Sequence, residues 1–256
     1  MIGRRDFCLA LGAALLLPAR SFSQDAGGFA AHLYRSAAGQ VMPYRLFMPA
    51  GYRRERRYPL VLWLHGGAGR GRDNLKQITG GNVAGSHVWT KAESQTSNPC
   101  LVVAPQCAEG EMWATLERAE PTGQLQLAVE VIEDLERRFS VDGRRIYVAG
   151  QSLGGFGAWS LMASYPRRFA AAIPACGGGD ESKARELARE NIWAFHGELD
   201  ASVSVERSRV MIAAIRRAGG KARFTEYKGE GHVIWEKVFK EPELLTWVFA
   251  QKAGKP

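Results

Sequence analysis

The sequence predicts a single α/β domain in which a doubly wound, mainly parallel β-sheet is covered by helices on both faces. Three observations lead to this prediction. Short apolar segments alternate along the chain with longer amphipathic segments, the order expected when each parallel strand is followed by a crossover helix. The chain has 256 residues, 46% of them apolar, so it can bury one large core. It contains no internal repeat and no low-complexity segment.

The predicted strands begin with a hairpin over residues 29–35 and 42–48, which turns around Ala38-Gly39. Residues 60–64 form a continuous apolar run, as a parallel strand buried on both faces should. The turn Asp142-Gly143 precedes another such run. The remaining strands are predicted over residues 101–104, 145–149, 170–174, 192–195 and 223–227.

The predicted helices are bounded by residues that cannot continue them. Apolar residues lie on one face of the segment 123–139. The helix predicted over residues 153–165 is stopped by Pro166, and Gly219-Gly220 is a good carboxyl-terminal stop for the preceding helix. The last two helices are predicted over residues 205–218 and 242–251.

Charge and motif content exclude several classes of protein. The formal net charge is +8, but the basic residues are scattered in pairs and form no stripe interleaved with aromatic residues. No nucleic-acid partner is therefore expected. No spacing of histidine and cysteine matches a zinc site, and no glycine motif is typical of a nucleotide or phosphate site. Neither a metal nor another cofactor is expected.

Four cysteines are present, of which Cys8 lies in the N-terminal segment described next. The remaining three are Cys100, Cys107 and Cys176, so at least one thiol is unpaired or bonded to another chain. Cys107 and Cys176 each follow a predicted strand. Whether they pair is left open, because the sequence does not give the distance that a disulfide requires.

Residues 1–23 are predicted to be an export signal that directs the remaining domain, residues 24–256, to the periplasm or the medium. Arg4-Arg5 precede an apolar run, residues 7–17, that is too short to cross a bilayer as a helix, so no stable membrane insertion is expected. Ser21-Phe22-Ser23 has the small residues of a cleavage site. The arginine pair favours the twin-arginine route. A general secretory signal and an N-terminal core helix are the alternatives.

The segment Gly150-Gln151-Ser152-Leu153-Gly154 is the strongest functional signal. It lies between a predicted strand and a predicted helix, so the chain must turn sharply at Ser152 and expose its hydroxyl group. The flanking glycines allow the neighbouring backbone to approach closely. Ser152 is therefore predicted to be a catalytic nucleophile. A purely structural glycine-rich turn is the alternative.

A serine hydroxyl needs a base that accepts its proton during attack. Among five histidines, His232 is best placed, because it follows the last predicted strand in the flexible turn Gly229-Glu230-Gly231. His32 lies within a strand, His65 begins a glycine-rich loop, and His196 ends a strand. His232 is predicted to be the general base. An exposed loop histidine without a role is the alternative.

Asp200 is predicted to orient this histidine and to stabilise its protonated form. It follows the strand before the last one. The resulting chain order of serine, aspartate and histidine differs from that of chymotrypsin-like and subtilisin-like enzymes. Asp180 is a rival for the same role, although helix capping explains it equally well.

Backbone N–H groups that stabilise a developing oxyanion are expected in the segment His65-Gly66-Gly67-Ala68, which ends the strand 60–64. We assign this role to the N–H groups of Gly67 and Leu153, since glycine permits close approach. Ala68 is an alternative to Gly67, because the sequence does not resolve a shift of one residue. A glycine-rich turn without this role is the other alternative.

These segments together resemble the α/β-hydrolase superfamily. The chain is similar to its exported carboxylesterases, a group with feruloyl-esterase-like and dienelactone-hydrolase-like members, some of which are described as peptidases or phospholipases. The resemblance spans residues 40–250 and implies a sheet of eight strands, with the roles given above for the five site residues. Dienelactone hydrolase itself has a cysteine nucleophile where this chain has Ser152, which puts dienelactone chemistry in doubt. The segments that carry the resemblance are residues 62–67, 103–107, 150–155, 196–200 and 231–232.

The predicted function is that of an exported serine carboxylesterase. It would act through an acyl-enzyme on short-chain or aromatic acyl esters, including esters linked to carbohydrate. A serine peptidase of the prolyl-oligopeptidase type uses the same three residues, but such enzymes usually carry a propeller domain that has no counterpart here. A non-catalytic binding protein of the same fold would normally have lost one of the three residues.

The substrate site is predicted to be open. Residues 176–191, between two predicted strands, number only 16, too few for a helical cap domain. The loops over residues 68–99 and 106–122 are expected to border the site. Three side chains are candidate substrate contacts: Trp113, His87 and Trp235. Packing against the sheet edge is the alternative role of Trp113. An open site buries little of a long acyl chain, so short or aromatic acyl groups are expected.

Overall fold

The computed structural model describes residues 26–254. The predicted export signal, residues 1–23, lies outside the described residues. Within the described range, no helix combines the length and the apolar character that a membrane crossing requires.

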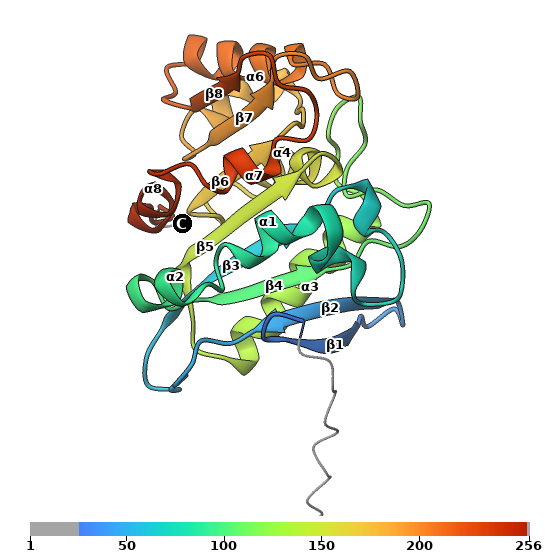
Figure 1. The fold of residues 1–256 in the computed structure, drawn as a ribbon, viewed down its shortest axis with the longest axis vertical. Helices are drawn as coiled ribbons and strands as arrows, with labels where there is room; N and C mark the ends of the chain where they lie inside the picture. The colour runs from blue at the N-terminus through green and yellow to red at the C-terminus, as the bar shows by residue number, and fades with distance from the viewer. Residues whose placement is uncertain (1–25, 255–256) are drawn as a thin grey trace, which may run out of the picture.

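An eight-stranded sheet runs through the centre of the molecule (Figure 1). In space the strands follow the order β1-β2-β4-β3-β5-β6-β7-β8. β2 runs antiparallel to both of its neighbours, whereas all neighbouring pairs from β4 to β8 are parallel. This arrangement confirms the predicted fold class. The strands are β1 (Phe29–Arg35), β2 (Val41–Phe47), β3 (Tyr58–Leu64), β4 (Leu101–Pro105), β5 (Val141–Gln151), β6 (Ala171–Ala175), β7 (Trp193–Gly197) and β8 (Arg223–Tyr227).

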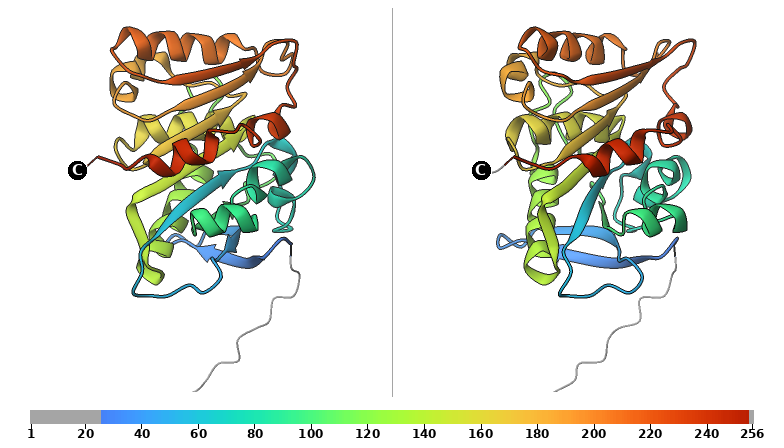
Figure 2. Two further views of the ribbon diagram at one scale, coloured as in Figure 1. Left: turned by 60° about the vertical axis from the view of Figure 1, so that its left-hand side comes forward. Right: turned by 90° about the vertical axis from the view of Figure 1, so that its left-hand side faces the viewer.

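Helices cover both faces of the sheet (Figures 1 and 2). One face is covered by α3 (Gly123–Arg138), α4 (Leu153–Ser164), α5 (Ala184–Leu187) and α6 (Glu206–Arg217). The other face is covered by α1 (Val83–His87), α2 (Ala92–Ser97), α7 (Trp235–Val238) and α8 (Leu244–Ala250). Four short 3-10 helices complete the described chain: η1 (Gly67–Gly69), η2 (Lys76–Ile78), η3 (Gly80–Asn82) and η4 (Glu181–Lys183).

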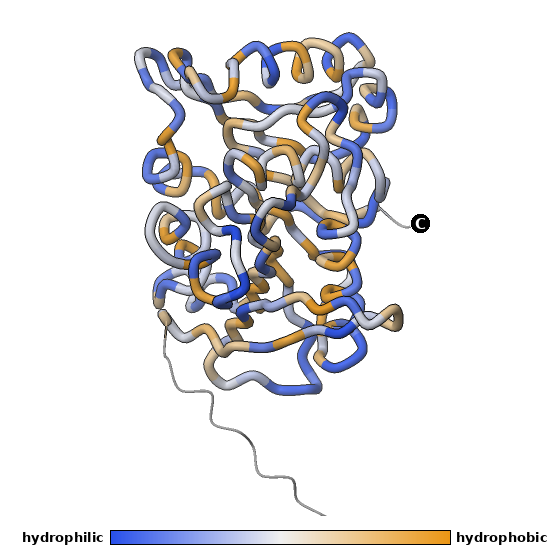
Figure 3. Tube along the Cα trace, turned by 90° about the vertical axis from the view of Figure 1, so that its right-hand side faces the viewer, coloured by the Kyte–Doolittle hydropathy of each residue, from blue (hydrophilic) through white to orange (hydrophobic). Residues whose placement is uncertain are grey.

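The alternation of side chains along β3 explains why the core has two layers. Leu60, Leu62 and Leu64 pack in the cluster that includes α3, α4 and α6. Val61 and Trp63 point to the opposite face and pack in the cluster that includes α7 and α8. Figure 3 shows hydrophobic segments gathered along the middle of the trace and hydrophilic ones on the outer turns. Each face of the sheet thus buries apolar surface against its own helices.

Most predicted elements agree with the structure to within two residues, but β5 begins earlier than expected. It starts at Val141, which pairs with Tyr58 of β3. The next pair in the register is Leu60 with Ile146, so residues 142–145 bulge out of the pairing with β3, and Oδ1 of Asp142 accepts a hydrogen bond of 3.1 Å from the N–H of Arg144. The predicted strand thus begins too late, because the pairing of Val141 precedes the bulge, while the local turn preference of Asp142-Gly143 is met inside the strand.

The segment predicted as a loop over residues 68–99 contains η1, η2, η3, α1 and α2. None of these helices is longer than the six residues of α2. Helices this short cannot show the periodicity of 3.6 residues from which a helix is predicted. The same holds for α7, which has four residues.

The connection between β6 and β7 contains only η4 and α5. Within the described residues no separate cap domain covers the sheet, which agrees with the expectation from the 16-residue interval.

The three cysteines within residues 26–254 are free thiols and are buried. Cys107 lies in the core layer that contains α3, whereas Cys100 and Cys176 lie in the layer that contains α8. The sheet therefore separates Cys107 from Cys176, and the open question of their pairing is answered: they are not bonded.

Candidate active site

Four predicted site residues meet at one edge of the sheet. Gly67 follows β3, Ser152 follows β5, Asp200 follows β7 and His232 follows β8. These strands are parallel, so their carboxyl ends lie at the same edge, where open α/β sheets bind their ligands. The topology alone thus brings together segments that are far apart in the sequence.

Ser152 stands at the sharp turn between β5 and α4. Its φ is 52° and its ψ is −115°, a backbone conformation that residues other than glycine rarely adopt. The turn needs glycine at its neighbours. A Cβ on Gly150 would lie 2.1 Å from the carbonyl oxygen of Gly154, and one on Gly154 would lie 1.9 Å from that of Leu64. The turn leaves the side chain of Ser152 partly accessible at the sheet edge.

Two hydrogen bonds connect Ser152, His232 and Asp200. Nε2 of His232 lies 2.9 Å from Oγ of Ser152, and Nδ1 of His232 lies 2.6 Å from Oδ2 of Asp200. Since a carboxylate only accepts, Nδ1 carries the proton and Nε2 is free to accept the hydroxyl proton of Ser152. The arrangement can activate the hydroxyl group for nucleophilic attack.

The carboxylate of Asp200 is fully buried. Its Oδ1 accepts hydrogen bonds from the backbone N–H groups of Ser202, at 2.9 Å, and Val203, at 2.8 Å. Burial favours the neutral acid, but the hydrogen bonds from Val203, His232 and Ser202 outweigh it and hold the pKa of Asp200 below its usual value. Asp200 is therefore ionised at neutral pH and can stabilise a protonated His232.

Asp180, the rival acid, lies elsewhere. Its side chain accepts a hydrogen bond of 2.9 Å from the N–H of Ser182 and caps η4. This hydrogen bond and the nearby Arg118 hold its pKa below the usual value. The structure thus places Asp200, and not Asp180, beside His232.

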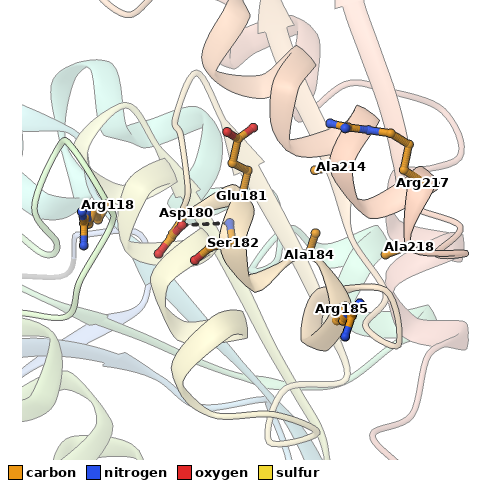
Figure 4. Close-up of a pocket in the computed structure, with 9 residues that line it drawn as sticks. All are labelled: Arg118, Asp180, Glu181, Ser182, Ala184, Arg185, Ala214, Arg217 and Ala218. Atoms are coloured by element: carbon orange, nitrogen blue, oxygen red, sulfur yellow. Dashed lines mark hydrogen bonds between the residues drawn. The ribbon is translucent and has the colours of Figure 1, made fainter.

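Asp180 also lines a surface groove of about 720 Å³ (Figure 4). None of Ser152, Asp200 and His232 lines this groove. The arginines around it do not converge on one point in the figure, and Asp180 is directed at Ser182. We assign no ligand to the groove, whose charged lining is Arg118, Arg185, Arg217, Asp180 and Glu181.

The backbone N–H groups of Gly67, Ala68 and Leu153 donate no hydrogen bond to any described residue. They lie at the starts of η1 and α4, the elements that follow β3 and β5. Such unpartnered donors suit the stabilisation of an oxyanion. Gly67 and Ala68 both remain candidates for the first donor. The carbonyl oxygen of Gly67 accepts from Nε of Arg70 at 3.2 Å, which helps to hold this loop.

Two further side chains, which the sequence did not single out, support the same loop. Oδ1 of Asn82 accepts a hydrogen bond of 3.1 Å from the N–H of Gly66. It also accepts one of 3.2 Å from Nε2 of Gln151, the residue before the nucleophile. Asn82 therefore connects the loop after β3 to the turn that holds Ser152. The position of Gln151 inside the serine motif was the only available signal for this network.

His65 joins the loop after β3 to the loop after β4. Its Nδ1 donates to the carbonyl oxygen of Gly66 at 2.7 Å, and its Nε2 accepts from the N–H of Cys107 at 3.0 Å. Burial lowers the pKa of His65 to about 4, so the ring is neutral and can serve as donor and acceptor at once. His65 thus has a structural role beside the candidate oxyanion site.

Two of the three candidate substrate contacts are wrong. Trp113 is fully buried, with its Nε1 donating to the carbonyl oxygen of His65 at 3.1 Å, so its packing role holds instead. His87 packs edge-on against Phe29, with 5.4 Å between ring centroids. Phe29 pairs with Phe47, which pairs with Val102 near the start of β4, far from the carboxyl edge.

The third candidate, Trp235, lies at the site but behind the histidine. Its ring meets that of His232 edge to face, with 5.2 Å between centroids, and only 7% of the residue is exposed. Trp235 therefore supports the imidazole more than it offers a surface to a substrate. Two large apolar side chains that adjoin the site residues in sequence are exposed: Leu199, next to Asp200, and Val233, next to His232.

The loop over residues 106–122 crosses from the end of β4 toward α6 (Figure 1). Nη1 of Arg207, in α6, donates to the carbonyl oxygen of Leu116 at 2.6 Å. In the same region Ala114, Ala119 and Phe156 form a small apolar cluster. This loop thus borders the site on the side of α4, as predicted.

A single group within residues 26–254 has the composition of a metal site: Cys176, His196 and Asp200, whose ligand atoms lie within 4.8 Å of one another. Each already has another role. Burial raises the pKa of the Cys176 thiol, which disfavours the thiolate that a metal needs. His196 and Asp200 are engaged in hydrogen bonds. We therefore treat the group as part of the hydrogen-bond network.

The model of the Esterase family ("Putative esterase") matches residues 36–177, more than half of the chain. The chain belongs to the Esterase family. This membership confirms the resemblance inferred from the motifs. No curated protein matches it in sequence.

Solved structures of two esterases are similar to this member of the Esterase family. A thermostable esterase is 38% identical, covers 88% of the chain and has a TM-score of 0.84. The chain spans 63% of the length of that protein. A ferulic acid esterase has a TM-score of 0.66, with 86% of this chain and 98% of the other covered. At 18% identity, this second similarity concerns the fold alone.

Proposed function

We propose that the protein is a serine carboxylic-ester hydrolase in which Ser152 is the nucleophile, His232 the general base and Asp200 the residue that orients it. The strongest support is the continuous chain of hydrogen bonds from Ser152 through His232 to the buried Asp200. Membership of the Esterase family supports the same reaction class.

In the proposed reaction, Oγ of Ser152 attacks the carbonyl carbon of the ester while Nε2 of His232 takes its proton. The carbonyl oxygen becomes an oxyanion, which receives hydrogen bonds from the N–H of Leu153 and from that of Gly67 or Ala68. His232 then gives the proton to the leaving alcohol, and an acyl-enzyme remains. A water molecule, deprotonated by His232, attacks this acyl-enzyme, and the carboxylic acid leaves as Ser152 regains its proton.

We propose short-chain or aromatic acyl esters as substrates, including those in which the alcohol is a carbohydrate. Ser152 and His232 are partly accessible, and the described residues contain no cap domain that could enclose a long chain. The exposed Leu199 and Val233 offer a small apolar surface beside them. The burial of Trp113 removes one argument for aromatic acyl groups, so the support for short aliphatic groups is stronger.

Short-chain preference can be tested with a series of nitrophenyl esters from acetyl to palmitoyl, together with feruloyl esters. We expect kcat/KM to peak at short chains, because an open site gains little of the roughly 0.8 kcal/mol per buried CH₂ that an enclosed pocket would provide. We also expect no rise in rate when a long-chain triglyceride exceeds its solubility limit. A sharp rise there would contradict the open site and require a mobile cover.

A peptidase acting through the same three residues is the alternative activity. Rates on an acetyl nitrophenyl ester and on a matched peptide nitroanilide distinguish the two, because both chromophores are released from the same acyl-enzyme step. We expect ester hydrolysis to dominate. Faster cleavage of the amide would make the protein a peptidase while leaving the roles of the three residues unchanged.

We also propose export of the protein by the twin-arginine route. Material purified from the periplasm or the medium should then begin near Gln24. Replacing Arg4-Arg5 by two lysines should block export, since the general secretory route tolerates lysine and the twin-arginine route does not. Exported protein that still begins at Met1 would contradict a cleaved signal, and normal export of the lysine variant would favour the general route.

A further inference from the structure

His196, at the end of β7, is fully buried beneath Asp200. Its Nε2 lies 2.9 Å from the carbonyl oxygen of Val203 and 3.3 Å from Oδ2 of Asp200. Both of these atoms are acceptors, so Nε2 carries the proton. Nδ1 then accepts the hydroxyl proton of Ser208, in α6, at 2.7 Å. All the polar atoms of the ring therefore have partners, and the orientation of the imidazole is defined.

His196 supports both oxygens of Asp200. It approaches Oδ2 directly through Nε2. It also holds the carbonyl group of Val203, whose own N–H donates to Oδ1 of Asp200 at 2.8 Å. A carboxylate has about four acceptor positions. Ser202 and Val203 occupy those of Oδ1, while His232 and His196 share those of Oδ2. The carboxylate therefore cannot rotate without losing a partner.

We propose that His196 is a positioning residue of the hydrolase, which fixes the Asp200 carboxylate so that Oδ2 faces Nδ1 of His232. The chain of hydrogen bonds that runs from Ser152 through His232 to Asp200 then continues to His196 and to Ser208 of α6. This inference rests on the proposed function, because it concerns the same site.

Burial lowers the pKa of His196, so the ring is neutral and acts by donating a hydrogen bond and not by adding a charge. The other titratable groups around Asp200 are Cys176 after β6 and His232 after β8. Glu226 of β8 influences His196 from the next strand, and it is paired with Arg209 of α6. Burial keeps Cys176 in its neutral thiol form. The side chains that donate hydrogen bonds to Oδ2 of Asp200 are therefore those of His196 and His232.

The first test replaces His196 by leucine, which keeps most of the volume and removes both nitrogen atoms. We expect kcat to fall about a hundredfold, the usual cost of misplacing a reacting group by about 1 Å, with KM changed less than about twofold. The acid limb of the profile of kcat against pH should move to higher pH. The reason is that the Asp200 carboxylate, with one hydrogen-bond donor fewer, attracts the imidazolium of His232 more strongly.

Two further variants separate positioning from packing. Glutamine at position 196 keeps an amide N–H that can reach Val203, so His196→Gln should recover at least about tenfold of the lost kcat. Ser208→Ala removes only the group that holds Nδ1, and it should lower kcat severalfold and move the acid limb in the same direction. The matched control is His32→Gln in β1, which should behave as the unmodified protein.

A His196→Leu protein with unchanged kcat and an unmoved acid limb would overturn the proposal. Equal losses in the leucine and glutamine variants without a shift of the limb would also overturn it, since the imidazole would then matter only for packing. If His196→Leu does not fold, the Ser208→Ala variant decides between the same outcomes. Loss of activity in Ser152→Ala, measured in parallel, keeps the proposed function separate, because that result does not depend on His196.

Discussion

Replacing Ser152 with alanine is expected to lower kcat on the order of a millionfold, the loss seen when a serine nucleophile is removed from such a triad. The fold should remain intact. Alanine has the same Cβ as serine, so the unusual backbone at φ 52° becomes no more strained. Only the hydroxyl group that donates to His232 is lost. Ester hydrolysis and the midpoint of thermal unfolding should be measured on the same preparation.

Ser160→Ala is a matched control for this variant. Ser160 lies in α4, two turns beyond Ser152, and its buried hydroxyl group has no hydrogen-bond partner. Its removal should leave the activity unchanged and the stability equal or higher. Labelling with an organophosphonate, followed by peptide mapping, identifies the nucleophile independently. Stoichiometric labelling of any residue other than Ser152 would falsify the assignment.

Asp200→Asn is expected to lower kcat about ten-thousandfold, as in a serine protease with the same substitution. The amide nitrogen of asparagine would face Nδ1 of His232 as a donor, which favours the tautomer with its proton on Nε2. A histidine in that tautomer cannot accept the proton of Ser152. Because the two residues have nearly the same volume, the buried site should still fold.

Asp180→Asn is the matched control for Asp200→Asn. Asparagine is as good a helix cap as aspartate, so the hydrogen bond to Ser182 can be kept and the activity should change less than about twofold. Both variants should be assayed at saturating substrate across the same pH range. Equal losses, or a larger loss at position 180, would transfer the role of the acid to Asp180.

The fold class and the location of the site could be predicted because both follow from local patterns and one rule of topology. The apolar run of β3 and the glycines around Ser152 are visible in the sequence itself. Once the sheet is taken as parallel, the residues that follow β5, β7 and β8 must lie at one edge. No tertiary information was needed to choose Asp200 over Asp180 as the first candidate.

The supporting contacts could not be predicted, because they depend on how loops fold back on the sheet. Asn82 reaches Gly66 from a segment of short helices that carries no periodic signal. Trp113 has the composition expected of a substrate contact, but its indole is buried against His65. His87 lies in the same segment of short helices and packs away from the carboxyl edge. In each case the way a loop packs against the sheet, which the sequence does not reveal, decided the role.

The buried cysteines of the two core layers can report on local opening of each layer. Cys107 lies in the layer that contains α3, whereas Cys100 and Cys176 lie in the layer that contains α8, and all three are inaccessible to solvent. A thiol reagent can modify a buried cysteine only when the surrounding structure transiently opens. The rate at which each cysteine is labelled in native buffer therefore measures how readily its own layer opens. A comparison of these rates shows which of the two layers opens more readily, and no residue has to be substituted to introduce a probe.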